Sequence, residues 1–361
     1  MAILLTGATG FLGSHLLAEL LARTGAGILC LVRAGDRAAG LARLREAACR
    51  HGLPPADEAR LEAVPGDLAA PLLGMDEAAF AALAARVETI YHAGAVVNWA
   101  YPYAALKATN VLGTQEVLRL ACRGRAKPVH HVSSIAVFLA AGRADADVIA
   151  EDDDLDGSTG LYGGYAQSKW VAEKMAATAR GRGLPVTVYR PGLIGGSRGG
   201  ADDFLARLVQ GCRQLGAAPA LGLAVDVAPV EYVAAAIVHL SRQAAAPGRA
   251  FHLVNPAPLP WDRFAAWLQG AAGRPLPLVP YEPWQARLQA ACRAEPSIAL
   301  RPLLPFLAAP GFAAQLVRLP PVDCRHALAG LAGSGIACPP VDAGLLDGYY
   351  GHLAAAGAPP R

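Results

Sequence analysis

Tyr165 and Lys169 lie four residues apart, in the string Tyr-Ala-Gln-Ser-Lys, at the start of a stretch with helical periodicity. Side chains four residues apart share one face of a helix, so the phenol and the ammonium can point into one cleft. A fixed positive charge favours the phenolate, so we expect it to draw the pKa of Tyr165 down from about 10 toward the working range of a general acid. The pair predicts acid–base chemistry, although the same spacing also fits an exposed helix pair.

Two further polar residues are expected near this pair. Ser134 directly follows a predicted strand, Val129–Ser133, and a doubly wound sheet binds ligands at the carboxyl ends of its strands. Its hydroxyl is therefore predicted to donate a hydrogen bond to a substrate carbonyl oxygen. Asn110 lies inside an otherwise apolar helical stretch. It either holds a water or a backbone carbonyl that relays protons behind Lys169, or it makes a hydrogen bond within its own helix.

A glycine-rich loop separates the first predicted strand from the first predicted helix. Its glycines let the backbone turn tightly and approach a pyrophosphate, whose charge meets the N–H groups at the start of the helix. Because the loop opens a βαβ unit, it predicts dinucleotide binding rather than a merely structural turn. The residues predicted to contact the cofactor along this loop are Thr6, Gly7, Thr9, Gly10, Phe11, Leu12 and Gly13.

The second predicted strand ends in Arg33, where a protein that prefers NAD carries Asp or Glu. A guanidinium attracts a 2′-phosphate and binds it bidentately, so NADP(H) is the predicted cofactor. Two alternatives remain: Arg33 is a solvated strand end, or Asp36, three residues on, binds the ribose instead. Arg43 on the next helix is either a second phosphate contact or an exposed helix arginine.

Short apolar runs alternate with stretches of helical periodicity through the first two thirds of the chain. Strands that alternate with helices pair in parallel, which predicts an α/β fold with a Rossmann-type doubly wound parallel sheet. The predicted strands are Ala2–Thr6, Gly27–Arg33, Leu61–Pro65, Thr89–His92, Val129–Ser133, Val186–Arg190 and Ala250–Val254. The predicted helices are Phe11–Arg23, Asp36–Arg50, Asp76–Arg86, Ala104–Cys122, Tyr165–Arg182 and Val230–Ser241.

From Pro256 onward proline becomes frequent, and helical stretches around Trp261–Gly270 and Arg325–Leu331 replace the strands. We therefore expect two domains. Residues 1–255 would form the NADP-binding Rossmann domain, with an insertion around 195–225 that belongs to the substrate lobe. Residues 256–361 would form a smaller, mainly helical C-terminal lobe that faces the substrate and its carrier.

The composition excludes several classes of protein. Of 361 residues, 54% are apolar and 17% are charged, and the net charge of +3 is small, so the chain is ordered rather than intrinsically disordered. No basic run suggests a nucleic-acid partner, and the seven scattered cysteines predict neither a disulfide framework nor a metal site. No apolar run reaches the roughly 18 residues of a membrane helix, so we expect no membrane partner and a reducing cytoplasm as the setting.

Several strings together resemble the extended short-chain dehydrogenase/reductase family, over nearly the whole chain. They are most similar to its thioester reductase branch, the reductive-release domains of nonribosomal peptide synthetases and the reductase domains of carboxylic acid reductases. The strings are Leu4–Leu17, Leu31–Ala34, Gly66–Leu68, Tyr91–Asn98, Asn110–Leu120, His131–Ser134, Gly164–Lys174, Tyr189–Gly192, Gly211–Gly216 and Gly335–Pro339. The chain departs from the branch at Ala93, at Glu231 and in a short loop, Gly195–Asp203.

The resemblance implies roles for individual residues. Ser134, Tyr165 and Lys169 would be catalytic, with Tyr165 and Lys169 also touching the cofactor. Arg33 would bind the 2′-phosphate, and Asp67 would lie at the adenine. The other implied cofactor contacts are Leu68, Ala93, Asn110, Pro191 and Gly192, the last two near the nicotinamide.

The activity that the resemblance implies is NADPH-dependent reduction of an acyl thioester. Hydride reaches the carbonyl carbon while Ser134 and Tyr165 stabilise the oxyanion, and the thiohemiacetal then releases thiolate and leaves an aldehyde. A second hydride transfer would give a primary alcohol. The chain carries neither an adenylation signature nor a carrier motif. We therefore expect the acyl group to come from a separate acyl- or peptidyl-carrier protein or from acyl-CoA, unless the chain is excised from a larger synthetase. We expect a monomer.

Alternatives to this activity remain open. An extended short-chain dehydrogenase that acts on a free nucleotide sugar or ketone would share the whole cofactor site. A non-catalytic NADP sensor would not need Ser134, Tyr165 and Lys169 together. Within thioester chemistry, Cys212 would take the acyl group if the reaction used a covalent intermediate. Its place in an apolar helical pattern favours a packed thiol instead.

Overall fold

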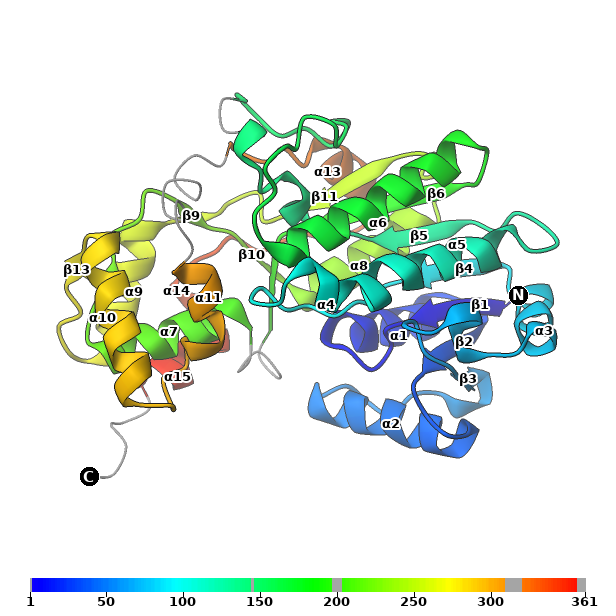
Figure 1. Cartoon of the computed structure of the whole chain (residues 1–361), viewed down its shortest axis with the longest axis horizontal. Coiled ribbons are helices and arrows are strands. Elements are labelled where there is room, and N and C mark those ends of the chain that lie inside the picture. The colour runs from blue at the N-terminus through cyan, green and yellow to red at the C-terminus, as the bar shows by residue number, and fades with distance from the viewer. Residues whose placement is uncertain (1, 144–145, 197–202, 309–319, 356–361) are drawn as a thin grey trace.

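A seven-stranded sheet forms the larger part of the molecule in the computed structural model, which describes residues 2–143, 146–196, 203–308 and 320–355 (Figure 1). The strands run in the order β11-β6-β5-β4-β1-β2-β3, and all neighbouring pairs are parallel. Their bounds are β1 (Ala2–Thr6), β2 (Gly27–Val32), β3 (Leu61–Pro65), β4 (Thr89–His92), β5 (Val129–Val132), β6 (Val186–Pro191) and β11 (Ala250–Leu253). The order confirms the predicted doubly wound fold and places the switch point between β1 and β4.

Helices cover both faces of this sheet, which explains why its strands are apolar throughout. Successive side chains of a strand point to opposite faces, so Ile3 and Leu5 of β1 pack into one core and Leu4 packs into the other. The first core is shared with α1 (Phe11–Arg23), α2 (Arg37–Arg50), α8 (Val230–Ser241) and α13 (Arg325–Leu331). The second core is shared with α3 (Glu77–Arg86), α5 (Gly113–Cys122) and α6 (Gly163–Gly181).

The predicted helix Ala104–Cys122 is not one continuous α-helix in the structure. It consists of α4 (Tyr103–Lys107), a π-helical turn, η3 (Ala108–Leu112), and α5. Asn110 lies in the π turn, and its side-chain amide binds the main chain of Val96 rather than a group of its own helix. Wide turns of this kind often occur at functional sites. The other predicted strands and helices agree with the structure within two residues at each end.

A second, mainly helical body is the C-terminal lobe, at the left of Figure 1. Residues of the range 205–227 and residues after 260 share its one hydrophobic core, which includes Phe264 and Trp284. Its helices are α7 (Phe204–Leu215), α9 (Trp261–Ala272), α10 (Tyr281–Ala294), α11 (Leu304–Leu307), α14 (Ala343–Leu346) and α15 (His352–Ala355). Short strands pair beside them: β7 (Leu193–Gly195) with β10 (Val227–Pro229), β8 (Ala218–Pro219) with β13 (Leu278–Val279), and β9 (Ala224–Val225) with β12 (Leu259–Pro260).

Helix α13 lies in the sequence range expected for the lobe, yet it packs on α8 and β11 of the sheet domain. The chain therefore returns to the sheet domain between the lobe helices α11 and α14. The domain boundary near residue 256 stays a prediction. Most of the loop Gly195–Asp203 falls outside the described residues.

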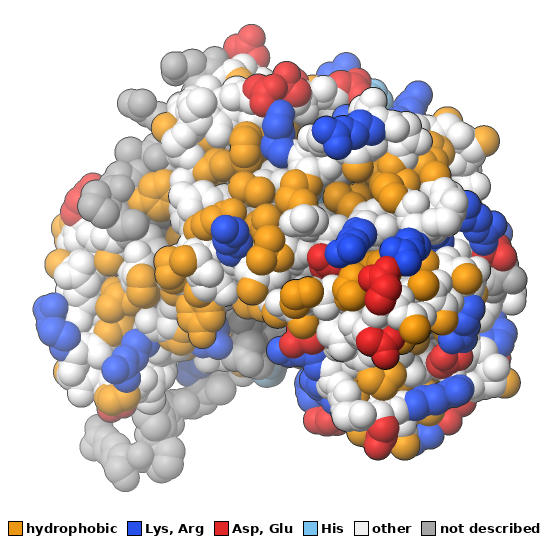
Figure 2. All heavy atoms as spheres, turned by 45° about the vertical axis from the view of Figure 1, so that its right-hand side comes forward, with side chains coloured by type: hydrophobic (Ala, Val, Ile, Leu, Met, Phe, Trp, Pro, Cys, Tyr) orange, Lys and Arg blue, Asp and Glu red, His pale blue; other side chains and the backbone are white. Residues whose placement is uncertain are grey.

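The surface drawn in Figure 2 carries charged side chains of both signs, most densely on the right-hand side, and hydrophobic side chains across its middle. Among the helices that the structure describes, none combines the length and the apolar character needed to cross a membrane. Nor do the described residues place three or more His, Cys, Asp or Glu side chains together as metal ligands.

Candidate active site

The side chains of Ser134, Tyr165 and Lys169 come together beyond the carboxyl end of β5. Ser134 caps a short 3-10 turn, η4 (Ile135–Phe138), and its hydroxyl lies close enough to that of Tyr165 to act on the pKa of the phenol. Lys169 lies one turn along α6 from Tyr165, and its Nζ donates to the Val132 carbonyl at 2.7 Å. All three predicted catalytic side chains are buried, with at most 8% of their surface exposed.

Burial sets the protonation state of Tyr165. It raises the pKa of the phenol to about 12, although the hydroxyl of Ser134 acts in the opposite direction. The sequence-based expectation that Lys169 lowers this pKa is therefore wrong for the structure. The ammonium is directed to the Val132 carbonyl, and burial of the phenol is the largest cause of its raised pKa. Tyr165 is protonated at neutral pH, which is the form that can donate a proton.

Lys169 is affected by burial in the opposite sense. Removal from water lowers its pKa to about 8, and the negative charge of Glu173, one turn further along α6, raises it. The side chain is therefore mostly charged at neutral pH and loses its proton in mildly alkaline solution. Both shifts arise because α6 is packed tightly against the end of the sheet.

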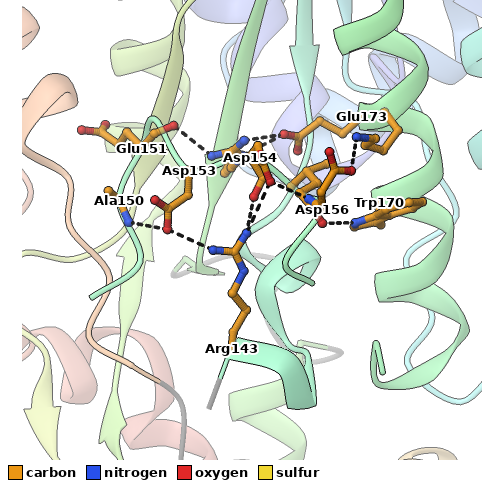
Figure 3. A network of polar contacts seen from close by, with 11 residues as sticks. Arg143, Ala150, Glu151, Asp153, Asp154, Asp156, Trp170 and Glu173 are labelled. Atoms are coloured by element: carbon orange, nitrogen blue, oxygen red, sulfur yellow. Dashed lines mark hydrogen bonds and ion pairs between the residues drawn. The ribbon is translucent and has the colours of Figure 1, made fainter. Parts of the chain in front are cut away.

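A buried polar network holds this part of α6 (Figure 3). Arg190 of β6 donates from Nε and Nη2 to Oε1 of Glu173, at 2.9 and 2.6 Å. Its Nη1 donates to the Glu151 carbonyl at 3.1 Å and is 3.1 Å from Nε2 of His252. The guanidinium lies over the ring of Phe138, 4.8 Å from its centroid. Arg190 thus connects α6, the turn that follows Ser134 and the strand that leads to Pro191.

The carboxylate of Glu151 extends the network to the C-terminal part of the chain. It is buried and accepts hydrogen bonds from the main-chain N–H groups of His252, His326 and Ala327. The last two lie in the first turn of α13. These hydrogen bonds join α13 to the sheet domain, in whose core Ala327 and Leu331 also pack.

The loop after β1 has no room for side chains. At Gly7, with φ of +79°, a Cβ would lie 2.7 Å from the nitrogen of Gly94, and at Gly13 a Cβ would lie 1.9 Å from the Gly7 carbonyl oxygen. Gly10 caps α1 and has no side chain to bind the first N–H groups of the helix, those of Phe11–Gly13. These groups are free to meet an anion, as a dinucleotide pyrophosphate would require.

The structure gives Thr6 a supporting position. Its Oγ1 is 2.7 Å from Nδ1 of His92 and accepts a hydrogen bond from the Gly94 N–H at 3.0 Å. The side chain thus joins the ends of β1 and β4 at the switch point. Ala93 packs closely against the glycine loop: a Cβ at Gly7 would lie 2.8 Å from the carbonyl carbon of Ala93. Thr9, in the same loop, is partly exposed.

Arg33 and Arg43 lie side by side at the end of β2. Both are exposed, and a guanidinium nitrogen of Arg43 donates to the Arg33 carbonyl. Within the described stretches of chain, neither side chain pairs with a carboxylate. Asp36, the alternative ribose ligand, accepts a hydrogen bond from the Ala39 N–H at 2.8 Å and so caps α2. The residues present fit a phosphate better than a ribose diol.

Asp67 and Leu68 follow β3 at the same edge of the sheet. Asp67 accepts a hydrogen bond from the Ala69 N–H at 2.9 Å. Leu68 is enclosed by two glycines: a Cβ at Gly94 would lie 2.4 Å from its Cδ1, and one at Gly113 would lie 2.7 Å from its carbonyl oxygen. The loops after β1, β3 and β4 are therefore in direct contact.

Asn110 joins the loop after β4 to α6. Its Oδ1 accepts from the Val96 N–H at 2.8 Å, and its Nδ2 donates to the Val96 carbonyl and to Oγ of Ser168, both at 3.0 Å. Among the described residues, the side chain binds a backbone carbonyl and makes no hydrogen bond within its own helix, and its part in a proton relay behind Lys169 stays a prediction. Its partners position the helix that carries Tyr165.

A cavity of about 930 Å³ opens beside Ser134 and Gly192, and residues of both the sheet domain and the lobe line it. Sequence reasoning missed two lining residues that lie at its catalytic end. The indole of Trp99 packs against Tyr165, with ring centroids 5.0 Å apart. Asp226 accepts a hydrogen bond from the Asn255 N–H at 2.7 Å, and burial raises its pKa to about 6.

The sequence contains a feature that could have pointed to each of Trp99 and Asp226. Trp99 directly follows the string Tyr91–Asn98, and Asp226 is the one charged residue between Arg213 and Glu231. A Cβ at Gly192 would lie 2.9 Å from the carboxylate of Asp226, so the loop after Pro191 runs against it.

Cys212 lies away from this cavity lining. It is fully buried in the lobe core, and burial raises the pKa of its thiol to about 12. A thiol in this environment is not available as a thiolate nucleophile near neutral pH. The structure therefore favours the packed thiol over the covalent alternative.

Comparisons with known proteins agree with this geometry. The NAD-binding family described as "Male sterility protein" matches residues 5–237. The terminal R domain of the myxalamid biosynthetic pathway is 41% identical, with a TM-score of 0.91 over 99% of this chain and 92% of that one. The reductase domain of a nonribosomal peptide synthetase from Mycobacterium tuberculosis is 29% identical, with a TM-score of 0.77 over 96% and 90% of the two chains.

One curated relative is a component of the linear gramicidin synthase of Brevibacillus parabrevis. It is 44% identical over 293 residues, which are 80% of this chain and 6% of the relative. Two further curated relatives are matched over 36% and 35% of their length. The chain therefore spans a minor part of each of these larger proteins.

Proposed function

The chain belongs to the NAD-binding male sterility protein family and to the reductase domains of nonribosomal peptide synthetases, and on that premise we propose that it reduces an acyl thioester to an aldehyde with NADPH. Members of this group are oxidoreductases that bind a nicotinamide cofactor. The thioester substrate, the phosphorylated form of the cofactor and the roles of individual residues are parts of the proposal.

One observation carries the proposal. The neighbouring hydroxyls of Ser134 and Tyr165 lie beside Lys169 at the carboxyl end of β5, where a large cavity begins. Two weakly acidic hydroxyl donors side by side match the oxygen of a carbonyl that gains negative charge. A sensor of NADP would not need this arrangement.

The bound cofactor would supply a hydride to the carbonyl carbon of the thioester. Ser134 and Tyr165 would donate hydrogen bonds to the developing oxyanion, and the high pKa of Tyr165 keeps its proton in place for this task. The charged Lys169 would hold the ribose and stabilise negative charge at Tyr165. When the thiohemiacetal collapses, the C–S bond breaks, and one hydride and one proton have been consumed to give one aldehyde and one thiol.

The exposed pair Arg33 and Arg43 supports NADPH over NADH. The guanidinium of Arg43 reaches the main-chain carbonyl of the exposed Arg33 at the end of β2, and the nearby carboxylate of Asp36 is engaged as a helix cap. A 2′-phosphate would neutralise the pair through charge-assisted hydrogen bonds. NADH offers no such group.

We propose that the acyl donor is a phosphopantetheine thioester, carried by an acyl- or peptidyl-carrier protein or by CoA. The relationship to a component of a peptide synthase supports a carrier-bound substrate. The aldehyde is the proposed product, and a second reduction to the alcohol would need fresh NADPH and the same three side chains.

The test is a panel of acyl-CoA and acyl-carrier thioesters, in which NADPH consumption, free thiol, aldehyde and alcohol are all quantified. We expect one NADPH and one thiol for each aldehyde, or two NADPH for each alcohol. Oxidation or reduction of free ketones or nucleotide sugars without turnover of any thioester would overturn the proposal in favour of a small-molecule dehydrogenase. Absence of any turnover, with NADPH still bound, would favour a sensor.

A further inference from the structure

The cavity beside the catalytic residues has a strongly aromatic and aliphatic lining. Trp99 packs on Tyr165 at one side and on Phe306 at the other, with ring centroids 5.0 and 5.3 Å apart, and it is 6.4 Å from the ring of Phe204. All but Tyr165 are cavity-lining residues. A continuous aromatic surface therefore leads from the catalytic phenol into the lobe.

The far part of the lining offers little hydrogen bonding to a ligand. The indole N–H of Trp261 donates to the Pro219 carbonyl at 2.7 Å, and the Tyr281 hydroxyl donates to the Leu307 carbonyl at 2.5 Å. These polar atoms are used within the protein, so the rings present apolar surface. The remaining aliphatic lining includes Leu205, Leu208, Leu221, Leu223 and Leu328.

The charged side chains among the described lining residues of the cavity are all of one sign. Among its described lining residues, Asp226 and Asp323 are carboxylates, and none is Lys, Arg or His. Asp323 is paired with Arg325, which lies outside the lining, whereas Asp226 accepts a hydrogen bond through Oδ1 from the Asn255 N–H. A carboxylate at the end of an acyl chain would lose its hydration in this cavity and would find no cationic partner among the described lining residues.

We propose that this cavity selects a large, uncharged, apolar acyl chain, aliphatic or aromatic, and rejects chains that end in a carboxylate. The inference deepens the proposed function, because it names the class of acyl group that the thioester carries. The volume of about 930 Å³ is at the upper end of the range for pockets that enclose drug-sized ligands, so short acyl groups would leave much of the apolar lining in contact with water. Trp99 is the residue that couples chain binding to the catalytic phenol.

Binding can be measured without turnover. Acyl pantetheine amides cannot release thiolate, and isothermal titration calorimetry in the presence of NADP⁺ would compare dodecanoyl, phenylbutanoyl, acetyl and ω-carboxydodecanoyl derivatives. Each buried methylene contributes roughly 0.8 kcal/mol, so we expect the first two to bind at least about tenfold more tightly than acetyl. We expect the ω-carboxydodecanoyl derivative to bind at least about tenfold more weakly than the dodecanoyl derivative.

A charge introduced into the lining provides the matched test. Leu223 is half-buried, and Leu223→Arg should weaken dodecanoyl binding and strengthen ω-carboxydodecanoyl binding. Trp99→Ala should weaken the binding of the dodecanoyl and phenylbutanoyl derivatives more than the binding of the acetyl derivative. Leu278→Gln, at an exposed leucine of the same lobe outside the cavity lining, should leave all four affinities unchanged. Retained NADP⁺ binding in each variant would show that it is folded.

Every outcome decides the inference. Equal affinity for all four chains, tighter binding of the carboxylated chain, or no saturable binding of any chain would overturn it. If the apolar amides bind as expected but no thioester is reduced, the proposed reaction fails while the chain-binding site stands. If thioesters of all classes are reduced with equal kcat/KM and the amides show no preference, the reaction stands and the inference fails.

Discussion

Arg190 and Glu173 form an ion pair that is almost completely buried, with Nη2 of the arginine 2.6 Å from Oε1 of the glutamate and no more than 5% of either side chain exposed. Glu173 lies one turn along α6 from Lys169 and raises the pKa of that lysine. The residues after Arg190 are Pro191 and Gly192, at the edge of the cavity. The pair therefore connects the strand that reaches the site with the helix that carries its acid–base groups.

Arg190→Ala should lower the free energy of unfolding by about 3–5 kcal/mol, because it leaves a buried carboxylate without its counter-charge. Chemical denaturation followed by circular dichroism measures the change. Arg45→Ala removes an arginine from an exposed ion pair with Glu58 and serves as the control, for which a far smaller loss is expected. Similar losses of unfolding free energy in the two variants would show that the buried pair stabilises the fold no more than an exposed pair does.

Glu173→Gln should move the alkaline limb of the kcat/KM profile to lower pH. In the native protein this limb is expected near pH 8, where Lys169 loses its proton. The glutamate favours the charged lysine, so removing its charge lowers the pKa of Lys169 and activity falls at a lower pH. The profile is measured with a single thioester at saturating NADPH. A limb that stays in place or moves to higher pH would contradict the proposed link between these residues.

Tyr165→Phe should reduce kcat by roughly 10²–10⁴-fold, because it removes the proton donor nearest to the developing oxyanion. The ring and its packing against Trp99 are preserved, so the dissociation constant for NADPH should change little. Single-turnover kinetics and a fluorescence titration separate the two effects. Equal losses in chemistry and in cofactor binding would instead indicate a structural role for the hydroxyl.

Arg33→Ser should shift the cofactor preference toward NADH. Loss of charge-assisted hydrogen bonds to a 2′-phosphate is expected to lower the ratio of kcat/KM for NADPH to that for NADH by about 10- to 100-fold. Arg50→Ser, at the far end of α2 where Arg50 pairs with Glu46, is the control. If both variants keep the native ratio, the phosphate is bound elsewhere.

Much of the sheet domain could be predicted from the sequence because its strands are short apolar runs separated by clear helical periodicity. The glycine loop was also predictable, since Gly7 and Gly13 occupy positions that admit no Cβ. The order of Ser134, Tyr165 and Lys169 along the chain indicated that they would meet. The hydrogen bond from Lys169 to the Val132 carbonyl is set by the packing of α6 and became visible only in the structure.

Other features depend on packing that no local pattern encodes. The apolar face of α13 predicted a helix but not which core it joins, and that is decided by Glu151, far away in sequence. The pKa of Tyr165 was predicted in the wrong direction because spacing reports the nearby charge and not the depth of burial. Trp99 was missed because its partner Phe306 is more than two hundred residues away.

The most direct test of the proposed reaction follows the hydride itself. NADPH carrying deuterium at the transferable position of the nicotinamide is incubated with the protein and an acyl thioester, and the aldehyde is analysed by mass spectrometry. The proposed mechanism predicts one deuterium at the aldehyde carbon and one equivalent of free thiol. An aldehyde without deuterium, or oxidation of NADPH with the thioester left intact, would contradict it.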